Sequence, residues 1–206
     1  MPRGDIDGNA KGETIMFAGH FGLAAAVKGK APEVPLWALM LSTQWLDIAF
    51  GPLLAAGVET MQPGEGEGGY GRWVFQAYYT HSLAGALILS AVAGLAARRW
   101  WGKRGGTVVG GLAFSHWILD LLVHRGDLPI LPGNLGNLPL LGFGLWRVPA
   151  VSIALEGALV AAGALLYARS LPRGRAGRAN RWRFPAAMAM AALLVLALVA
   201  DVAGVG

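Results

Sequence analysis

FSHWILDLLVH, from Phe114 to His124, is the stretch on which both the fold and the function depend. It is an apolar run that carries His116, Asp120 and His124 at intervals of four residues. In an α-helix, residues at this spacing lie on one face. Polar side chains in an apolar helix are costly unless they have partners. Two interpretations follow: the three residues hold helices together, or one helix presents several ligands to a metal ion.

The composition is that of an integral membrane protein. Of the 206 residues, 55% are hydrophobic and 14% are charged, and the mean hydropathy is +0.50, which is too apolar for an ordinary soluble domain. The absence of cysteine excludes disulfides, thiolate metal ligands and cysteine nucleophiles. The formal charge of +5 comes from arginines in short loops, so it indicates membrane topology and no binding to nucleic acid.

Apolar segments near the length of a membrane span predict an all-α fold, a polytopic membrane helical bundle of five to six transmembrane helices. We expect a single integral membrane domain over residues 1–206, with a polar N-terminal tail at 1–13. The first segment is short for a span and could be re-entrant. The six segments are Thr14–Val27, Pro35–Gly57, Tyr78–Ala97, Thr107–Val123, Pro149–Ala168 and Phe184–Val202.

Charge alternates between the loops that join these segments. The loops after the first, third and fifth segments are basic, and the positive-inside rule assigns them to the cytoplasm. This predicts a multi-pass protein of a bacterial-type inner (plasma) membrane, with membrane lipids as partners and both termini outside. The ionisable residues of the segments then fall in the outer half of the bilayer.

All four histidines lie in or at the ends of these segments, together with two aspartates and a glutamate. Scattered structural polar residues would have no reason to converge on one level of the membrane, so we expect a shared site for a divalent metal. Imidazole and carboxylate ligands suit zinc best, with manganese or iron as alternatives. Asp47, His81, His116 and Asp120 would be enough for one ion. The candidate metal ligands are His20, Asp47, His81, His116, Asp120 and His124.

The short motifs that carry these residues resemble those of a known family. Their order is similar to that of the LexA-regulated inner-membrane family of metal-dependent hydrolases, and to the ligand order of the bacterial zinc-dependent phospholipase C fold. This resemblance implies that the same four core residues bind metal, with His20 sharing Asp120 at a second ion. The motifs are GH (Gly19, His20), LD (Leu46, Asp47), THSL (Thr80 to Leu83), SHWILD (Ser115 to Asp120) and LE (Leu155, Glu156).

Three functions are compatible with such a site. In a metal-dependent hydrolase, a metal-bound hydroxide would attack a small-molecule or lipid phosphate ester or a similar lipid-like substrate. Glu156 or Asp47 would act as the base, and Arg147 as an electrostatic aid at the outer mouth.

A membrane permease or carrier could move protons or a divalent cation through the same cluster. A structural protein could hold a metal without turnover. The inner half of the segments is almost free of polar residues, which favours the hydrolase over the carrier.

Overall fold

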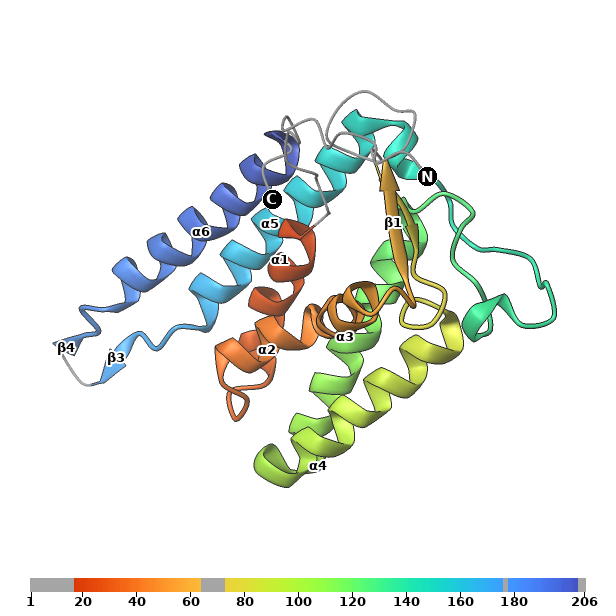
Figure 1. Cartoon of the computed structure of the whole chain (residues 1–206). Helices are drawn as coiled ribbons and strands as arrows, with labels where there is room; N and C mark the ends of the chain where they lie inside the picture. Colours follow the sequence, from red (N-terminus) through yellow and green to blue (C-terminus); the bar gives the residue numbers. More distant parts are fainter. Residues whose placement is uncertain (1–16, 64–72, 176–177, 204–206) are drawn as a thin grey trace.

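The computed structural model describes residues 17–63, 73–175 and 178–203, and this part of the chain is mostly helical (Figure 1). Two short antiparallel hairpins, β1–β2 and β3–β4, join the helices. The elements are α1 (Ala18–Val27), α2 (Leu36–Thr43), α3 (Trp45–Ala55), β1 (Thr60–Pro63), β2 (Trp73–Gln76), α4 (Leu83–Val123), α5 (Pro149–Ser170), β3 (Gly174–Arg175), β4 (Arg178–Ala179) and α6 (Arg183–Ala203), with short 3₁₀ turns η1 (Lys28–Lys30), η2 (Pro132–Asn134) and η3 (Leu145–Arg147).

Three of these helices, α4, α5 and α6, are long and apolar enough to cross a membrane. The bent pair α2 and α3 would add a fourth if it counts as one span. The predicted helical fold, with apolar helices of membrane-spanning length, is therefore confirmed, whereas five to six spans are not. The first predicted segment contains α1, whose 10 residues are too few to span a bilayer. The polar tail at 1–13 lies outside the described residues.

The second predicted segment is broken at Gln44, where α2 and α3 meet at an angle of 53°. Just before the break, Ser42 and Thr43 each donate a hydrogen bond to the carbonyl oxygen three residues earlier. Such side-chain bonds compete with the backbone bonds of a helix. The break places the Thr43 carbonyl oxygen beside α4, where it becomes part of the site described below.

Helix α4 consists of two antiparallel arms, which correspond to the third and fourth predicted segments (Figure 1). The backbone leaves the helical conformation at Trp101 and Gly102, and Gly102 has a φ of +67°, which glycine adopts without strain. The arms meet at glycines: a Cβ atom on Gly94 would lie 2.9 Å from the carbonyl oxygen of Gly106 and 3.2 Å from Gly110 Cα. This close contact returns the second arm, with its histidines, to the level at which the first arm begins.

Helix α1 packs across α5, and α6 runs beside α5 (Figure 1). The crossing of α1 and α5 also depends on glycine. A Cβ atom on Gly22 would lie 2.6 Å from the carbonyl oxygen of Leu159, and one on Gly163 would meet the backbone of Gly22. The backbones of α1 and α5 therefore lie in direct contact at this crossing.

Candidate metal centre

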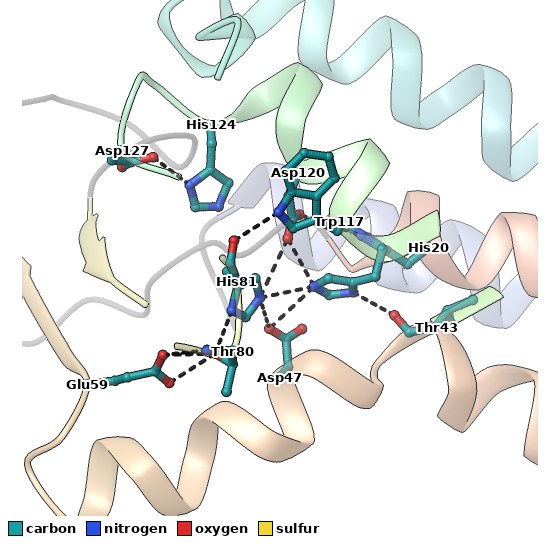
Figure 2. A network of polar contacts seen from close by, with 11 residues as sticks. His20, Thr43, Asp47, Glu59, Thr80, His81, Trp117, Asp120, His124 and Asp127 are labelled. Atoms are coloured by element: carbon teal, nitrogen blue, oxygen red, sulfur yellow. Dashed lines mark hydrogen bonds and ion pairs between the residues drawn. The ribbon is translucent and has the colours of Figure 1, made fainter. Parts of the chain in front are cut away.

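Four separate parts of the chain bring five of the predicted ligands together (Figure 2). His20 comes from α1, Asp47 from α3, His81 from the turn before α4, and His116 and Asp120 from the second arm of α4. Four of these five residues are at most 5% exposed. The exception is Asp47, whose side chain is 25% exposed. The centre is thus buried, with one edge open at Asp47.

The separations between the donor atoms fit a metal site. The Nε2 atom of His116 lies 3.1 Å from Asp120 Oδ2 and 3.5 Å from Asp47 Oδ1. The Nε2 atom of His81 lies 3.3 Å from Asp47 Oδ1, 3.4 Å from His116 Nε2 and 3.6 Å from Asp120 Oδ2. Metal–ligand bonds of about 2.0–2.1 Å in a tetrahedral site give donor atoms about 3.3–3.4 Å apart. These five separations lie within a few tenths of an ångström of that value.

The donors form two overlapping groups. One contains His20, His116 and Asp120, and the other contains Asp47, His81 and His116; within each group the ligand atoms lie within 4.8 Å of one another. Because the single lone pair of His116 Nε2 binds one ion, His116 can complete only one group at a time. The buried His and Asp residues could therefore hold a metal ion, and the identity of that ion is open.

The hydrogen bonds behind the histidines fix which ring nitrogen faces the centre. The Thr80 hydroxyl lies 2.9 Å from Glu59 Oε2 and 2.9 Å from His81 Nδ1. An ionised carboxylate only accepts, so the hydroxyl donates to Glu59 and its oxygen accepts from the Nδ1–H of His81. His116 Nδ1 lies 2.6 Å from the carbonyl oxygen of Thr43, which also only accepts. In both neutral imidazoles the proton therefore sits on Nδ1, and Nε2 presents a lone pair to the centre.

The result is a cluster of acceptors. The two Nε2 lone pairs and the carboxylate oxygens of Asp47 and Asp120 lie 3.1–3.6 Å apart with no donor hydrogen among them. Asp47 Oδ2 is also buried, without a hydrogen-bond partner among the described residues. Acceptors at these distances repel one another unless a cation lies between them. That cation is a metal ion or a proton on one of the imidazoles.

His124, the sixth predicted ligand, lies at the rim of the centre. Its Nδ1 atom is 3.0 Å from Asp127 Oδ1, so the carboxylate accepts the Nδ1 proton and Nε2 is left as an acceptor. Its ring packs against Trp146, with 4.3 Å between the centroids. His124 belongs to neither three-residue group but lines the adjoining cavity.

Glu156 and Arg147, the other residues predicted to take part in catalysis, lie elsewhere. Glu156 is fully buried, and its Oε1 atom accepts a hydrogen bond of 3.1 Å from the N–H of Gly19. Asp201 Oδ2 accepts from two further N–H groups of the same turn. The two carboxyl groups thus hold the beginning of α1, which carries His20. Arg147 is exposed on η3, and neither Glu156 nor Arg147 lines the cavity.

A cavity of about 240 Å³ adjoins the acceptor cluster. Its polar floor contains all four histidines and two aspartates, and its walls are apolar. Among the described residues, no lysine or arginine lines it. The lining residues are Phe17, His20, Asp47, Phe50, Phe75, Ala77, His81, His116, Asp120, His124 and Trp146.

Three supporting residues escaped the sequence analysis. Glu59 follows the second predicted segment, yet it is 1% exposed and accepts hydrogen bonds from Thr80 and from the N–H of Tyr79. Asp127 lies three residues after His124, just past the end of α4. Thr80 lies in the quoted THSL motif, and a hydroxyl residue directly before a histidine was a usable signal for a supporting contact.

Comparisons of the chain with protein-family models, with curated proteins and with solved structures find no match. The resemblance to a hydrolase family therefore rests on the short motifs alone.

Proposed function

We propose that the chain is a membrane-embedded, metal-dependent hydrolase acting on a phosphate ester or lipid-like substrate in the outer half of a bacterial-type inner membrane. One observation carries the proposal: the acceptor cluster of His81, His116, Asp47 and Asp120 borders a cavity large enough to admit another molecule. A metal held only for structural reasons needs no adjoining cavity.

The residues divide into ligands and a base. Asp47, His81 and His116 would hold one ion, and Asp120 with His20 would complete the set or hold a second ion. Zinc is the expected metal, with manganese or iron as alternatives, and a bound ion would polarise the scissile group and activate a water molecule. Of the two candidate bases, only Asp47 lines the cavity, and its Oδ2 atom is available to accept a proton.

The other chain residues position these groups. Glu59 and Thr80 orient the His81 ring, and Glu156 with Asp201 holds the turn that precedes His20. We therefore propose that Glu156 positions the start of α1 and does not act as the base. Arg147 is exposed on the turn next to Trp146, and in this proposal it meets a substrate headgroup at the membrane surface.

A carrier for protons or a divalent cation is the second candidate. A carrier needs polar groups on both sides of its binding site. A hydrophobic core follows His20 and precedes Asp47 and His116 along their helices. It consists of Ala24, Ala31, Val34, Ala38, Leu39, Ala97, Val109 and Leu112. The buried polar side chains described in that region carry no charge: Ser42, Thr43, Gln44 and Ser90. This packing favours the hydrolase.

Metal analysis of the detergent-purified protein tests the proposal. His116→Ala and Asp120→Ala should each lower the zinc, manganese or iron content at least tenfold, and hydrolysis of p-nitrophenyl esters or phosphates should fall in parallel. Ser90→Ala is the matched control, because Ser90 is buried in the same helix and lies outside both ligand groups. Unchanged metal content in the two ligand variants would refute the site. Metal or proton flux into liposomes without hydrolysis would replace the hydrolase by the carrier.

A further inference from the structure

One wall of the cavity is made of aromatic rings from three elements. Phe50 of α3 contacts Phe75 of β2, with ring centroids 6.2 Å apart, and Phe75 contacts Trp146 of η3 at 6.4 Å. The wall reaches the polar floor at both ends, since Phe50 lies 6.0 Å from the ring of His81 and Trp146 lies against His124. A molecule in the cavity would therefore have apolar surface on one side and the acceptor cluster on the other.

Trp146 contributes the unusual feature of this wall. It is 6% exposed, and its indole Nε1–H has no hydrogen-bond acceptor among the described residues. Buried indole groups normally find an acceptor. The neighbouring Trp117 does so, donating to the carbonyl oxygen of His81 at 2.9 Å. Trp146 thus brings to the cavity lining an indole donor that is buried and unsatisfied among the described residues, and an acceptor oxygen that reached this donor would be stabilised.

The charges of the centre narrow the kind of acceptor. Asp47 and Asp120 together carry two negative charges, which offset the charge of one divalent ion. Among the described residues, no lysine or arginine lines the cavity to hold a phosphate dianion. A neutral carbonyl oxygen suits this environment better than a doubly charged phosphate.

The surface next to Trp146 is apolar. The loop between α4 and η3 exposes Leu135 and Phe143, each at 70%, together with Leu138 and Leu140 at 37% and 36%. In Figure 1 this loop extends from the bundle on the side where α4 ends. Exposed apolar side chains of this kind mark a surface that contacts lipid. The loop that leads to Trp146 is therefore suited to contact with a bilayer.

We propose that the substrate is a neutral, long-chain acyl ester, whose carbonyl oxygen accepts a hydrogen bond from Trp146 Nε1–H and whose acyl chain packs against Phe50 and Phe75. This inference rests on the proposed function and narrows its substrate class. In the reaction, the oxygen of water bonds to the carbonyl carbon and the ester bond to the alcohol oxygen breaks. A proton from the water passes to that oxygen, so that the products are a fatty acid and an alcohol.

Kinetics with p-nitrophenyl decanoate and p-nitrophenyl phosphate test the substrate class. Trp146→Phe keeps an aromatic ring and removes the donor, so it should raise KM for the decanoate about fivefold, the effect of one neutral hydrogen bond. Its metal content should equal that of the wild type, which also shows that the variant is folded. Trp37→Phe is the matched control, because Trp37 is 61% exposed on α2 and should leave KM unchanged.

A binding measurement separates this inference from the proposed function. Tritiated N-methyldecanamide offers the same carbonyl and chain without an ester, and its binding to the protein in nanodiscs can be measured by scintillation proximity. We expect about fivefold weaker binding in Trp146→Phe. Equal binding in the two proteins would overturn the assignment of Trp146. Turnover of the phosphate but not of the decanoate would overturn the acyl ester and leave the hydrolase intact. Trp146-dependent amide binding without any hydrolysis would support the binding mode and remove the proposed function.

Discussion

The contact between Glu59, Thr80 and His81 provides the sharpest test of the metal centre. Thr80→Val keeps the shape of the side chain and removes only the hydroxyl. His81 Nδ1–H then loses its acceptor, which lies at 2.9 Å in the wild type. Glu59 loses the hydroxyl donor but keeps the N–H groups of residues 79 and 80, at 2.8 and 2.9 Å. The imidazole remains present, so any loss of metal binding reflects its orientation and tautomer alone.

The expected size of the effect follows from these contacts. Removing the group that orients a metal-binding histidine typically weakens metal affinity about 10–100-fold, which corresponds to about 1.4–2.7 kcal/mol. The free energy of unfolding should also fall, by about 1.5–3 kcal/mol, because the lost hydroxyl bond is made to a charged group. Ser42→Ala serves as the control, because Ser42 is buried and its hydroxyl bonds a backbone carbonyl at 2.8 Å. That variant should lose about 1 kcal/mol of stability with unchanged metal affinity.

Zinc titration against a competing fluorescent chelator measures the affinity of the detergent-solubilised protein, and thermal unfolding shows that each variant is folded. The reasoning is refuted if Thr80→Val binds zinc within about twofold of the wild type while Ser42→Ala does the same. In that case the proton of His81 Nδ1 does not determine how Nε2 meets the ion.

Two further predictions concern α1 and its supports. Gly163→Ala places a methyl group against the backbone of α1 and should destabilise the protein by about 1–3 kcal/mol. The control is Gly157→Ala in the same helix, whose methyl group meets nothing within 4 Å and should be neutral or stabilising by up to about 1 kcal/mol. Unfolding temperatures that fall equally in the two variants would contradict the close crossing. Asp201→Ala removes the acceptor for two N–H groups at the start of α1, which should speed the hydrogen exchange of these groups. Asp201→Asn keeps an acceptor oxygen and should speed the exchange less. Equal exchange in both variants would argue against the contact.

The long helices could be predicted from the sequence because their apolar runs are continuous. Helices α5 and α6 begin and end within two residues of the predicted segments, and the two arms of α4 match the third and fourth segments. The break at Gln44 could not be predicted, because it lies within a continuous apolar run that contains no proline or glycine between residues 36 and 50. The β1–β2 hairpin lies between the second and third predicted segments, where the sequence analysis predicts no regular structure.

Part of the candidate centre could also be predicted, because helical spacing places some of its residues on one face. The interval of four residues placed His116 and Asp120 on one face, and their common level in the membrane suggested that His20, Asp47 and His81 would join them. Depth along a helix does not determine direction, so the same reasoning could not tell that Glu156 faces the start of α1.

The helical face that carries His116 and Asp120 also ends before His124. Helix α4 stops at Val123, and His124 has an extended backbone with φ −60° and ψ 143°. The spacing of four residues therefore no longer sets the direction of its side chain, which explains its place at the rim.

The supports of three histidines share one origin: each comes from a point where a helix is interrupted. The Thr43 carbonyl lies at the end of α2, Thr80 precedes α4, and Asp127 follows it. Inside an apolar helix the backbone polar groups are already bonded to one another, so a regular span has few groups left with which to orient a ring. A helical membrane protein that must fix the Nδ1 proton of a buried imidazole therefore needs a helix end beside it. The end of α2 meets this requirement for His116, because it leaves the Thr43 carbonyl oxygen 2.6 Å from Nδ1 of the ring.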